Sequence, residues 1–514
     1  MRRIFFTGLF LCLISGLAFG QEPADALRYS YLTGQGGTAR NQALGGAGAS
    51  LGGEFTSLFL NPAGLGFYRT SEFVVTPMVR ANSNNANYLG ENSNATKSKF
   101  TLSTTGFIMP TSGNRGNVRN VTVGFGINRV ADFNNSISYS AYNNQSSYAE
   151  QYLEELISNN VTNANDAAQN FPFGASQAFN TFLIDTVSGA NGQVAGYQTF
   201  ANPNLGNGLL QSMSMQTSGG ITDASLGVGV NLLDKWYFGG SLSLPILRYE
   251  RNSIYGESDP TSTMPNFNFF NAIESLKTTG VGVNGKFGVI YSPEPKVRIG
   301  LAFYTPTFYQ LTDLYNMTIV ADMKGYGDQG PHQMSSTNLN DGQLLRSRYN
   351  MTTPLRAILS GTYFISTGEE VQQQKGFVTA DVEYVDYSKA AFHSASNDES
   401  YKTYYSSINT LMDQMYGKAI NARIGTELKF NLFMVRFGGA YYGNPYQTES
   451  ANTMKASGGV GYRNRGFFLD LAYTYAHQKD VDYPYVLQDK PNNPAFLNNK
   501  GSYITLTAGF KLQQ

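Results

Sequence analysis

Ionisable side chains at alternate positions of apolar segments are the residues of this chain best suited to recognising a ligand. They are Lys286, Arg298, Arg356, Asp381, Glu383, Arg423, Glu427, Lys429, Arg436, Lys455 and Asp470. An arginine can hold a carboxylate through two parallel hydrogen bonds. The candidate contacts for an acidic ligand are therefore Arg298, Arg356, Arg423 and Arg436, with Lys286 as a further cation. The alternative is structural, because buried charges of opposite sign must pair with one another.

Residues for catalysis or metal binding are sparse. The histidines His332, His393 and His477 belong to no HExxH sequence, no metal-spaced cluster and no assembled Ser/His/acid motif. The single cysteine, Cys12, lies in the apolar leader described next. We expect no catalytic residue, no metal site, no cofactor and no disulfide. The sequence therefore does not predict an enzyme.

The first twenty residues are typical of a secretory signal peptide. Arg2 and Arg3 are followed by an apolar run, residues 4–14, and by the small-x-small sequence Ala18-Phe19-Gly20. Cleavage is expected before Gln21, so the mature chain is exported by the Sec route. Cys12 lies inside the apolar core of this leader, which argues against a lipoprotein.

Composition favours an all-β chain. Of the 514 residues, 41% are hydrophobic, 14% are charged and 55 are glycine, a balance poorly suited to long helices. Beyond the leader no apolar run reaches the roughly 18 residues that a transmembrane helix needs. A formal net charge of zero and scattered basic residues argue against nucleic-acid binding. One tryptophan against 34 tyrosines and 34 phenylalanines is compatible with the aromatic girdles of membrane barrels.

Period-two alternation recurs along the chain and predicts β-strands. It is clearest at the C-terminus, where Ile504, Leu506, Ala508, Phe510 and Leu512 alternate with polar or small residues. The predicted segments are 72–80, 98–109, 119–131, 222–231, 236–249, 281–291, 297–305, 345–366, 374–388, 420–430, 433–441, 454–462, 467–475 and 503–512. The segment 345–366 is kept whole through Pro354, taken as a bulge or kink, because bacterial barrels use an even strand number.

Connection lengths alternate between short and long. Short connections are expected at 110–118, 231–235, 292–296, 367–373, 431–432 and 463–466, and long ones at 81–97, 132–221, 250–277, 314–344, 389–418, 442–453 and 477–501. Outer-membrane barrels pair short periplasmic turns with long extracellular loops. In a soluble β-sandwich nothing requires short and long connections to alternate. The pattern predicts a transmembrane antiparallel β-barrel of about 14 strands in the bacterial outer membrane.

Two long loops carry helical patterns. Residues 148–158 would place Tyr152, Leu153, Leu156 and Ile157 on one face, and residues 404–416 would place Ile408, Leu411, Met412 and Met415 likewise. Such apolar faces either cap the barrel or form a groove that captures hydrophobic ligands.

The glycine-rich stretch 34–69 ends in Asn61-Pro62-Ala63-Gly64-Leu65, which resembles the NPAGL element of the FadL/OmpP1/TodX family of outer-membrane barrels. Segments 297–309, 353–356 and 381–387 resemble sequences that are common in Bacteroidetes members of this family. The resemblance implies a barrel at 71–514, fourteen strands, and an N-terminal hatch at 21–70 that plugs it. Glycine suits a plug because it lets backbones approach closely.

The resemblance also implies a function. Members carry hydrophobic molecules inward, so we expect passive uptake of compounds such as long-chain fatty acids or hydrocarbons, by a monomer surrounded by outer-membrane lipid and lipopolysaccharide. The terminal strand resembles the signal read by the barrel-assembly machinery, although Gln513 and Gln514 depart from the usual aromatic terminus. Members release ligand sideways near a kinked early strand. Here that strand is 119–131, where Gly124 and Gly126 either permit a bend or make room for the hatch.

Two other functions stay open. Some barrels of this type serve as shuttle or attachment components of the type IX secretion system and bind protein instead of lipid. A general porin is the other possibility, but a hatch of some fifty residues would obstruct its channel.

Overall fold

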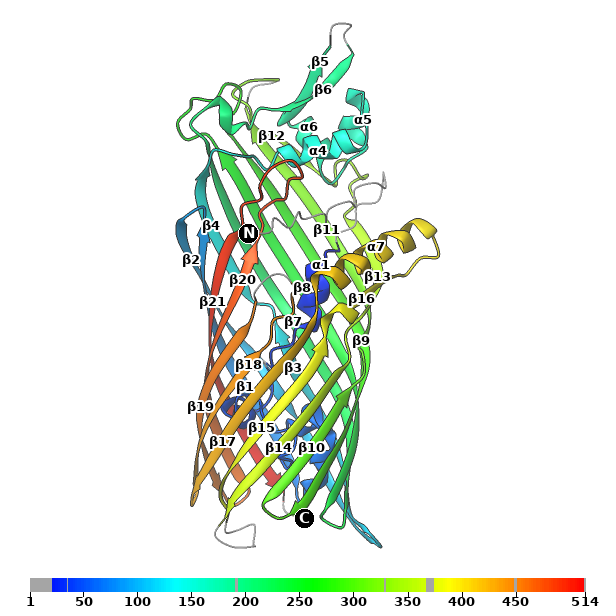
Figure 1. Ribbon diagram of the computed structural model, residues 1–514, viewed down its shortest axis with the longest axis vertical. Helices are drawn as coiled ribbons and strands as arrows, with labels where there is room; N and C mark the ends of the chain where they lie inside the picture. The colour runs from blue at the N-terminus through cyan, green and yellow to red at the C-terminus, as the bar shows by residue number, and fades with distance from the viewer. Residues whose placement is uncertain are drawn as a thin grey trace.

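The computed structural model of the chain describes residues 21–34, 36–189, 193–327, 330–366, 374–447 and 451–512 (Figure 1). The expected signal peptide, residues 1–20, and Gln513–Gln514 lie outside this part of the chain. None of the described helices is both long and apolar enough to cross a bilayer.

A single antiparallel sheet closes on itself to form a barrel. Its strands are Ser71–Tyr88 (β1), Glu91–Arg115 (β2), Val118–Asp132 (β3), Asn135–Asn143 (β4), Leu209–Leu232 (β7), Trp236–Ser258 (β8), Phe269–Glu294 (β9), Val297–Tyr304 (β10), Phe308–Asp322 (β11), Leu345–Thr352 (β13), Arg356–Ser366 (β14), Gln374–Asp386 (β15), Ala391–Ser394 (β16), Lys418–Phe430 (β17), Phe433–Tyr442 (β18), Thr453–Asn464 (β19), Phe467–Asp482 (β20) and Ala495–Leu512 (β21). Pairing of β1 with β21 closes the wall.

The wall has fourteen positions when only the described residues are counted, as the sequence predicts. Four of them are each built from two consecutive strands: β3 with β4, β10 with β11, β13 with β14, and β15 with β16. The other ten are the single strands β1, β2, β7, β8, β9, β17, β18, β19, β20 and β21. An even number lets both ends of the chain leave the wall at the same end of the barrel.

Side chains alternate between the two faces of the wall. In β17, Ile420 and Ile424 are exposed outside, while Asn421 and Arg423 are buried inside. Apolar residues exposed outside also include Leu242, Phe287, Leu301, Leu359, Phe437 and Ile504. An apolar exterior and a polar interior are what a barrel in a lipid bilayer requires.

The two ends of the barrel differ. At one end, here the turn end, the chain reverses within two or three residues at 116–117, 233–235, 295–296, 431–432 and 465–466. At the opposite end, the loop end, connections run at 144–208, 259–268, 323–344, 395–417, 443–452 and 483–494. Most predicted loops are shorter than expected because the strands continue beyond the apolar band.

The predicted long connection 81–97 is wrong. β1 and β2 continue as a hairpin to a two-residue turn at Leu89 and Gly90. This stretch is rich in asparagine and serine and lacks apolar alternation. Hydrophobic periodicity therefore does not detect it, although its backbone pairing is regular.

Two neighbouring wall positions are interrupted at prolines. Pro306 separates β10 from β11, and Pro354 separates β13 from β14. Threonines bridge the gap: Thr307 donates its N–H to Thr353 Oγ1 at 2.9 Å, and Thr353 donates its N–H to Thr307 O at 3.0 Å. The interruption at Pro354 fits the expected kink, whereas the one at Pro306 was not predicted. Proline has no N–H to give to a ladder, so both breaks follow from its chemistry.

The N-terminal segment, residues 21–70, lies inside the barrel (Figure 1). It contains the helices Pro23–Ser30 (α1), Ala39–Ala43 (α2) and Ser57–Leu60 (α3) and the 3₁₀ helix Pro62–Phe67 (η1). Its start lies near the loop end, where Gln21 donates to Asp313 at 2.8 Å, and it leads into β1 at the turn end.

The loop end carries helices at both places where the sequence predicts them. The long 144–208 loop holds Glu150–Ser158 (α4), Ala164–Gln169 (α5), Ala175–Asn180 (α6) and a small hairpin of Ile184–Ser188 (β5) with Val194–Thr199 (β6). A second loop holds Glu399–Met415 (α7). Tyr152 and Leu156 of α4 are buried, but Ile157 is 65% exposed, so the predicted apolar face of α4 is only partly covered.

The predicted face of α7 packs toward the barrel. Ile408 and Met412 are buried with Tyr404 and Tyr405 in a cluster that includes α1. Both tyrosines donate to Gln21, at 3.3 Å to its backbone oxygen and 3.2 Å to its side-chain oxygen. The helix therefore covers the start of the N-terminal segment.

Candidate functional site

The Asn61–Leu65 sequence is a buried turn at the centre of the N-terminal segment. Asn61 Oδ1 accepts from the Ala63 N–H at 3.1 Å, which begins η1 with Pro62 in its first turn. Asn61 Nδ2 donates to Ala49 O at 2.6 Å and lies 3.4 Å from Leu301 O of the wall. One side chain thus starts the helix, ties two parts of the segment together and reaches the barrel.

Glycines of the wall make room for this turn. A Cβ at Gly288 would overlap Asn61 Oδ1, and a Cβ at Gly239 would overlap the backbone of Pro62. Gly438 meets the backbone of Gly45 and Leu44 in the same way. Glycines in strand interiors commonly mark such close approaches. The neighbouring strands β8 and β9 are therefore shaped to receive the turn, and β18 is shaped to receive residues 44–45.

Gly124 and Gly126 also face the segment. Both pair in regular register with β2 and β7. A Cβ at Gly126 would lie 2.7 Å from Phe55 Cζ, and one at Gly124 would lie 3.5 Å from Leu65. The predicted role of these glycines in a lateral opening stays a prediction. Their visible contacts are with the N-terminal segment.

Toward the loop end, β3 separates from β2. Its pairing with β2 ends at Asn128, and its register with β7 shifts between Arg129 and Ala131. The following backbone crosses the inner face of β1, where Arg80 donates to Asp132 O at 3.0 Å and Asn82 donates to Asn134 O at 2.6 Å. Beyond this point β2 and β3 are not paired, but β4 lies close to β2, and Lys97 of β2 donates to Thr217 O of β7 at 2.9 Å.

Four of the five candidate cations pair with carboxylates. Arg436 contacts Glu427 and Asp470, each at 2.6 Å. The other pairs are Lys286 with Asp223 at 2.9 Å, Arg423 with Glu383 at 3.3 Å and with Asp381 at 3.8 Å, and Arg356 with Glu383 at 3.5 Å. Arg356 also donates to Ser30 O of the N-terminal segment. These contacts match the structural interpretation of the interior charges, and Lys429 is exposed.

Arg40 is a site residue that the sequence did not single out. It lies on α2 and donates Nε to Glu427 Oε2 at 2.8 Å and Nη2 to Oε1 at 3.0 Å. Glu427 therefore lies between a cation of the N-terminal segment and Arg436 of the wall. The glycine-rich surroundings of Arg40 gave no indication of this pairing.

Arg298 is the exception among the five candidates. Its guanidinium carbon lies over the rings of Phe67 and Phe364, 3.9 and 4.5 Å from their centroids, and Arg298 donates to Leu51 O. Within the described part of the chain no carboxylate lies within 4.0 Å of it, and its Nε is buried without a hydrogen-bond partner.

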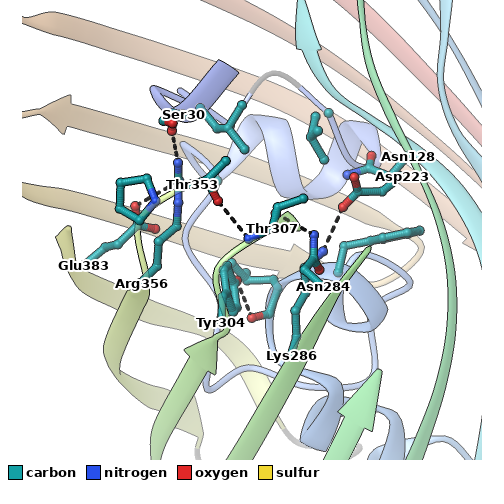
Figure 2. A pocket seen from close by; sticks show the side chains of 18 of the residues that line it. Ser30, Asn128, Asp223, Asn284, Lys286, Tyr304, Thr307, Thr353, Arg356 and Glu383 are labelled. Atoms are coloured by element: carbon teal, nitrogen blue, oxygen red, sulfur yellow. Dashed lines mark hydrogen bonds and ion pairs between the residues drawn. The ribbon is translucent and has the colours of Figure 1, made fainter. Parts of the chain in front are cut away.

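A cavity of about 130 Å³ lies between the N-terminal segment and the wall. Figure 2 shows Lys286 reaching Asp223, Asn284 reaching Thr307, and Arg356 directed at Ser30 around it. Phe59, Leu60, Tyr304 and Tyr309 supply apolar surface. The cavity adjoins the interruption at Pro306 and Pro354, since Thr305, Thr307 and Pro354 line it. It suits a small or partly inserted molecule with both apolar and polar parts.

A second, larger cavity of about 790 Å³ lies at the turn end. Its lining includes Leu51, Phe67, Tyr237, Phe364, Phe377 and Met434, and the cations Arg40, Arg69, Lys235, Arg298, Lys429 and Arg463. We call it the turn-end vestibule. Among the described residues no group of three or more potential metal ligands occurs.

Comparisons with known proteins indicate the fold. No protein-family model matches the sequence, and no curated protein matches it. A solved FadL homologue from Pseudomonas aeruginosa is similar at a TM-score of 0.55 and 12% identity, over 93% of this chain and 98% of that one. The toluene transporter TodX from Pseudomonas putida is similar at 0.51 and 12% identity, over 94% of this chain and 100% of that one. The chain therefore has the FadL- and TodX-type outer-membrane barrel fold.

Proposed function

We propose that the protein is an outer-membrane channel for passive uptake of hydrophobic compounds. The observation that carries the proposal is a membrane-type barrel whose interior is occupied by its own N-terminal segment, with a cavity left between segment and wall. The likeness to the FadL homologue and to TodX supports the same function. The turn end would face the periplasm and the loop end the cell surface.

In this proposal residues 1–20 are a Sec signal peptide, residues 21–70 are a plug and residues 71–514 form the barrel. The plug excludes the continuous water column of a general porin. A hydrophobic molecule would instead move through cavities between plug and wall. The end of the β2–β3 pairing at Asn128 is the place that we propose for a sideways path into lipid. Fatty acids and hydrocarbons are the substrate classes proposed.

An uptake assay tests the proposal. The protein would be expressed in a Gram-negative host that lacks its own fatty-acid channel, because an intact outer membrane slows hydrophobic compounds. We expect faster accumulation of radiolabelled oleate or toluene than with an empty vector. A matched variant, Phe59→Arg, places a charge at the cavity and should abolish the gain, whereas Ile157→Arg on the exposed side of α4 should not. Equal uptake with protein and vector would contradict the proposal.

A further inference from the structure

The outer face of the wall continues beyond the apolar band at the loop end of four neighbouring strands, β20, β21, β1 and β2. The band ends near Ile504 of β21 and Tyr473 of β20, which pair in register and are both exposed. From there β21 extends back to its first residue, Ala495, and β1 and β2 run beside it to their turn. At about 3.4 Å per residue this extension is roughly 30 Å long. It therefore stands outside the hydrocarbon layer.

Two exposed lysines lie at the base of this extension. Lys500 of β21 pairs in register with His477 of β20, and Lys479 pairs with Asn498. Lys479 and Lys500 are thus diagonal neighbours on one face of the sheet, about 7–8 Å apart. Neither ammonium group forms an ion pair with a carboxylate in the described part of the chain. Both charges are therefore available to an anion outside the wall.

The outer face of β8 and β9 shows a different arrangement at the same height. Lys277 lies four residues beyond an exposed apolar residue of the band, as Lys500 does. Its Nζ is 3.6 Å from Glu250 Oε1, and Arg248 is 2.8 Å from the same oxygen. A carboxylate of the protein therefore neutralises the cations of that arc. The lysines of β20 and β21 have no such partner, so the two arcs differ in what they can bind.

An asparagine-rich surface continues outward from the two lysines. It consists of Asn85 and Asn87 of β1, Asn92 and Asn94 of β2, and Asn498 of β21. Asn87 Nδ2 donates to Asn92 Oδ1 at 3.0 Å, which leaves further donors and acceptors on both amides. At the outward positions of these four strands the described residues include no carboxylate. Such a surface offers neutral hydrogen-bonding groups that match the hydroxyls of a saccharide.

We propose that the outer face of β20, β21, β1 and β2 binds a phosphorylated glycolipid of the outer leaflet. Lys479 and Lys500 hold its phosphate, and the asparagine-rich surface lies along its saccharide. Its acyl chains lie below, where Tyr473 and Tyr475 are exposed at the level at which aromatic residues of membrane barrels gather. The inference rests on the orientation given in the proposed function, with the loop end at the cell surface. It adds a lipid partner held outside the barrel.

The test measures lipid binding to the full-length protein in detergent by native mass spectrometry. Its three probes are diphosphoryl lipid A, lipid A from which both phosphates have been removed, and phosphatidylglycerol. One lysine beside an anionic lipid corresponds to about fivefold in affinity, and two to roughly 25-fold. We expect wild type to prefer diphosphoryl lipid A over the dephosphorylated form by about that factor, and to bind phosphatidylglycerol more weakly.

Matched variants locate the phosphate contact. Lys500→Gln should reduce the preference about fivefold, and Lys479→Gln combined with Lys500→Gln should remove most of it. Lys277→Gln removes the same charge from a lysine that Glu250 neutralises, and should change the preference less than about twofold. All three positions are on the outer face of the wall, so the variants are expected to fold.

Several outcomes would overturn the site. Equal binding of both forms of lipid A by wild type, or a preference that survives in the double variant, would contradict the phosphate contact. Phosphatidylglycerol bound as tightly as diphosphoryl lipid A would contradict the role of the asparagine-rich surface. A dimer that disappears in the double variant would assign the face to a second copy of the chain. Neither lysine lines the two cavities described above, so these failures would leave uptake of hydrophobic compounds standing. Failed uptake by a protein that still prefers diphosphoryl lipid A would contradict the proposed function alone.

Discussion

Arg40 of α2 and Glu427 of β17 form a two-point ion pair at 2.8 and 3.0 Å across 387 residues of sequence. The pair joins the N-terminal segment to the wall. Glu427 also accepts from Arg436 at 2.6 Å, so the segment shares a carboxylate with the ion pairs of the barrel itself. The N-terminal segment and the wall are therefore stabilised together.

Removing Arg40 should loosen the N-terminal segment. Breaking a buried ion pair costs about 3–5 kcal/mol when one charge is left alone, although Glu427 keeps Arg436 as a partner. We expect Arg40→Ala to speed hydrogen exchange at residues 39–46 and to leave the barrel strands protected. Arg346→Ala, at an exposed position of β13, is the control. Unchanged exchange in Arg40→Ala would show that the pair does not hold the segment.

Wall glycines should tolerate substitution according to what they face. Gly438→Ala would drive a methyl group into the backbone of Gly45, whereas Gly361→Ala meets nothing within 4 Å. Overpacking costs about 1–3 kcal/mol. Thermal unfolding in detergent should show a lower midpoint for Gly438→Ala alone. Equal midpoints for the two variants would mean that the N-terminal segment shifts away from the added methyl group without loss of stability.

The threonine bridge at the proline interruptions should contribute to stability. Thr353→Val removes the acceptor of the Thr307 N–H and leaves that donor buried, at a cost of about 1–3 kcal/mol. Urea unfolding should show this loss. Thr111→Val, which removes an exposed hydroxyl, should change stability little. A Thr353→Val protein as stable as wild type would indicate that water replaces the hydroxyl.

Docking of the loop helices should depend on pH. Burial raises the pKa of Glu155 in α4 to about 7, only partly offset by the hydrogen bond from the Ala175 N–H of α6. The folded loop therefore binds a proton more tightly than the unfolded one, so its stability falls as pH rises from about 4.5 through 7. Hydrogen exchange in α4 and α6, corrected for the intrinsic rise of exchange with pH, should quicken between about pH 5 and 7. Glu155→Gln should remove that dependence, and a dependence that persists would assign it to another group.

The barrel could be predicted from sequence because period-two alternation is enforced wherever one face meets lipid. Beyond the apolar band that requirement ends, so the polar continuation of β1 and β2 was predicted as a loop. The partner of Arg40 could not be predicted, because nothing local encodes a contact across 387 residues. The alternation of apolar and polar residues predicts that Arg298 and Arg436 both lie on the inner face of the barrel wall. Only the packing of the N-terminal segment distinguishes a cation paired with acids from one left facing a cavity.

The proposed channel holds a hydrophobic ligand between the N-terminal segment and the wall. The most direct measurement is native mass spectrometry with lipid extraction on protein purified gently from outer membranes, comparing wild type with a deletion of residues 30–66. We predict a fatty acid or other hydrophobic small molecule that co-purifies with wild type and is lost from the deletion. An empty barrel that brings down a secreted protein instead would contradict the account and favour a secretion-system component.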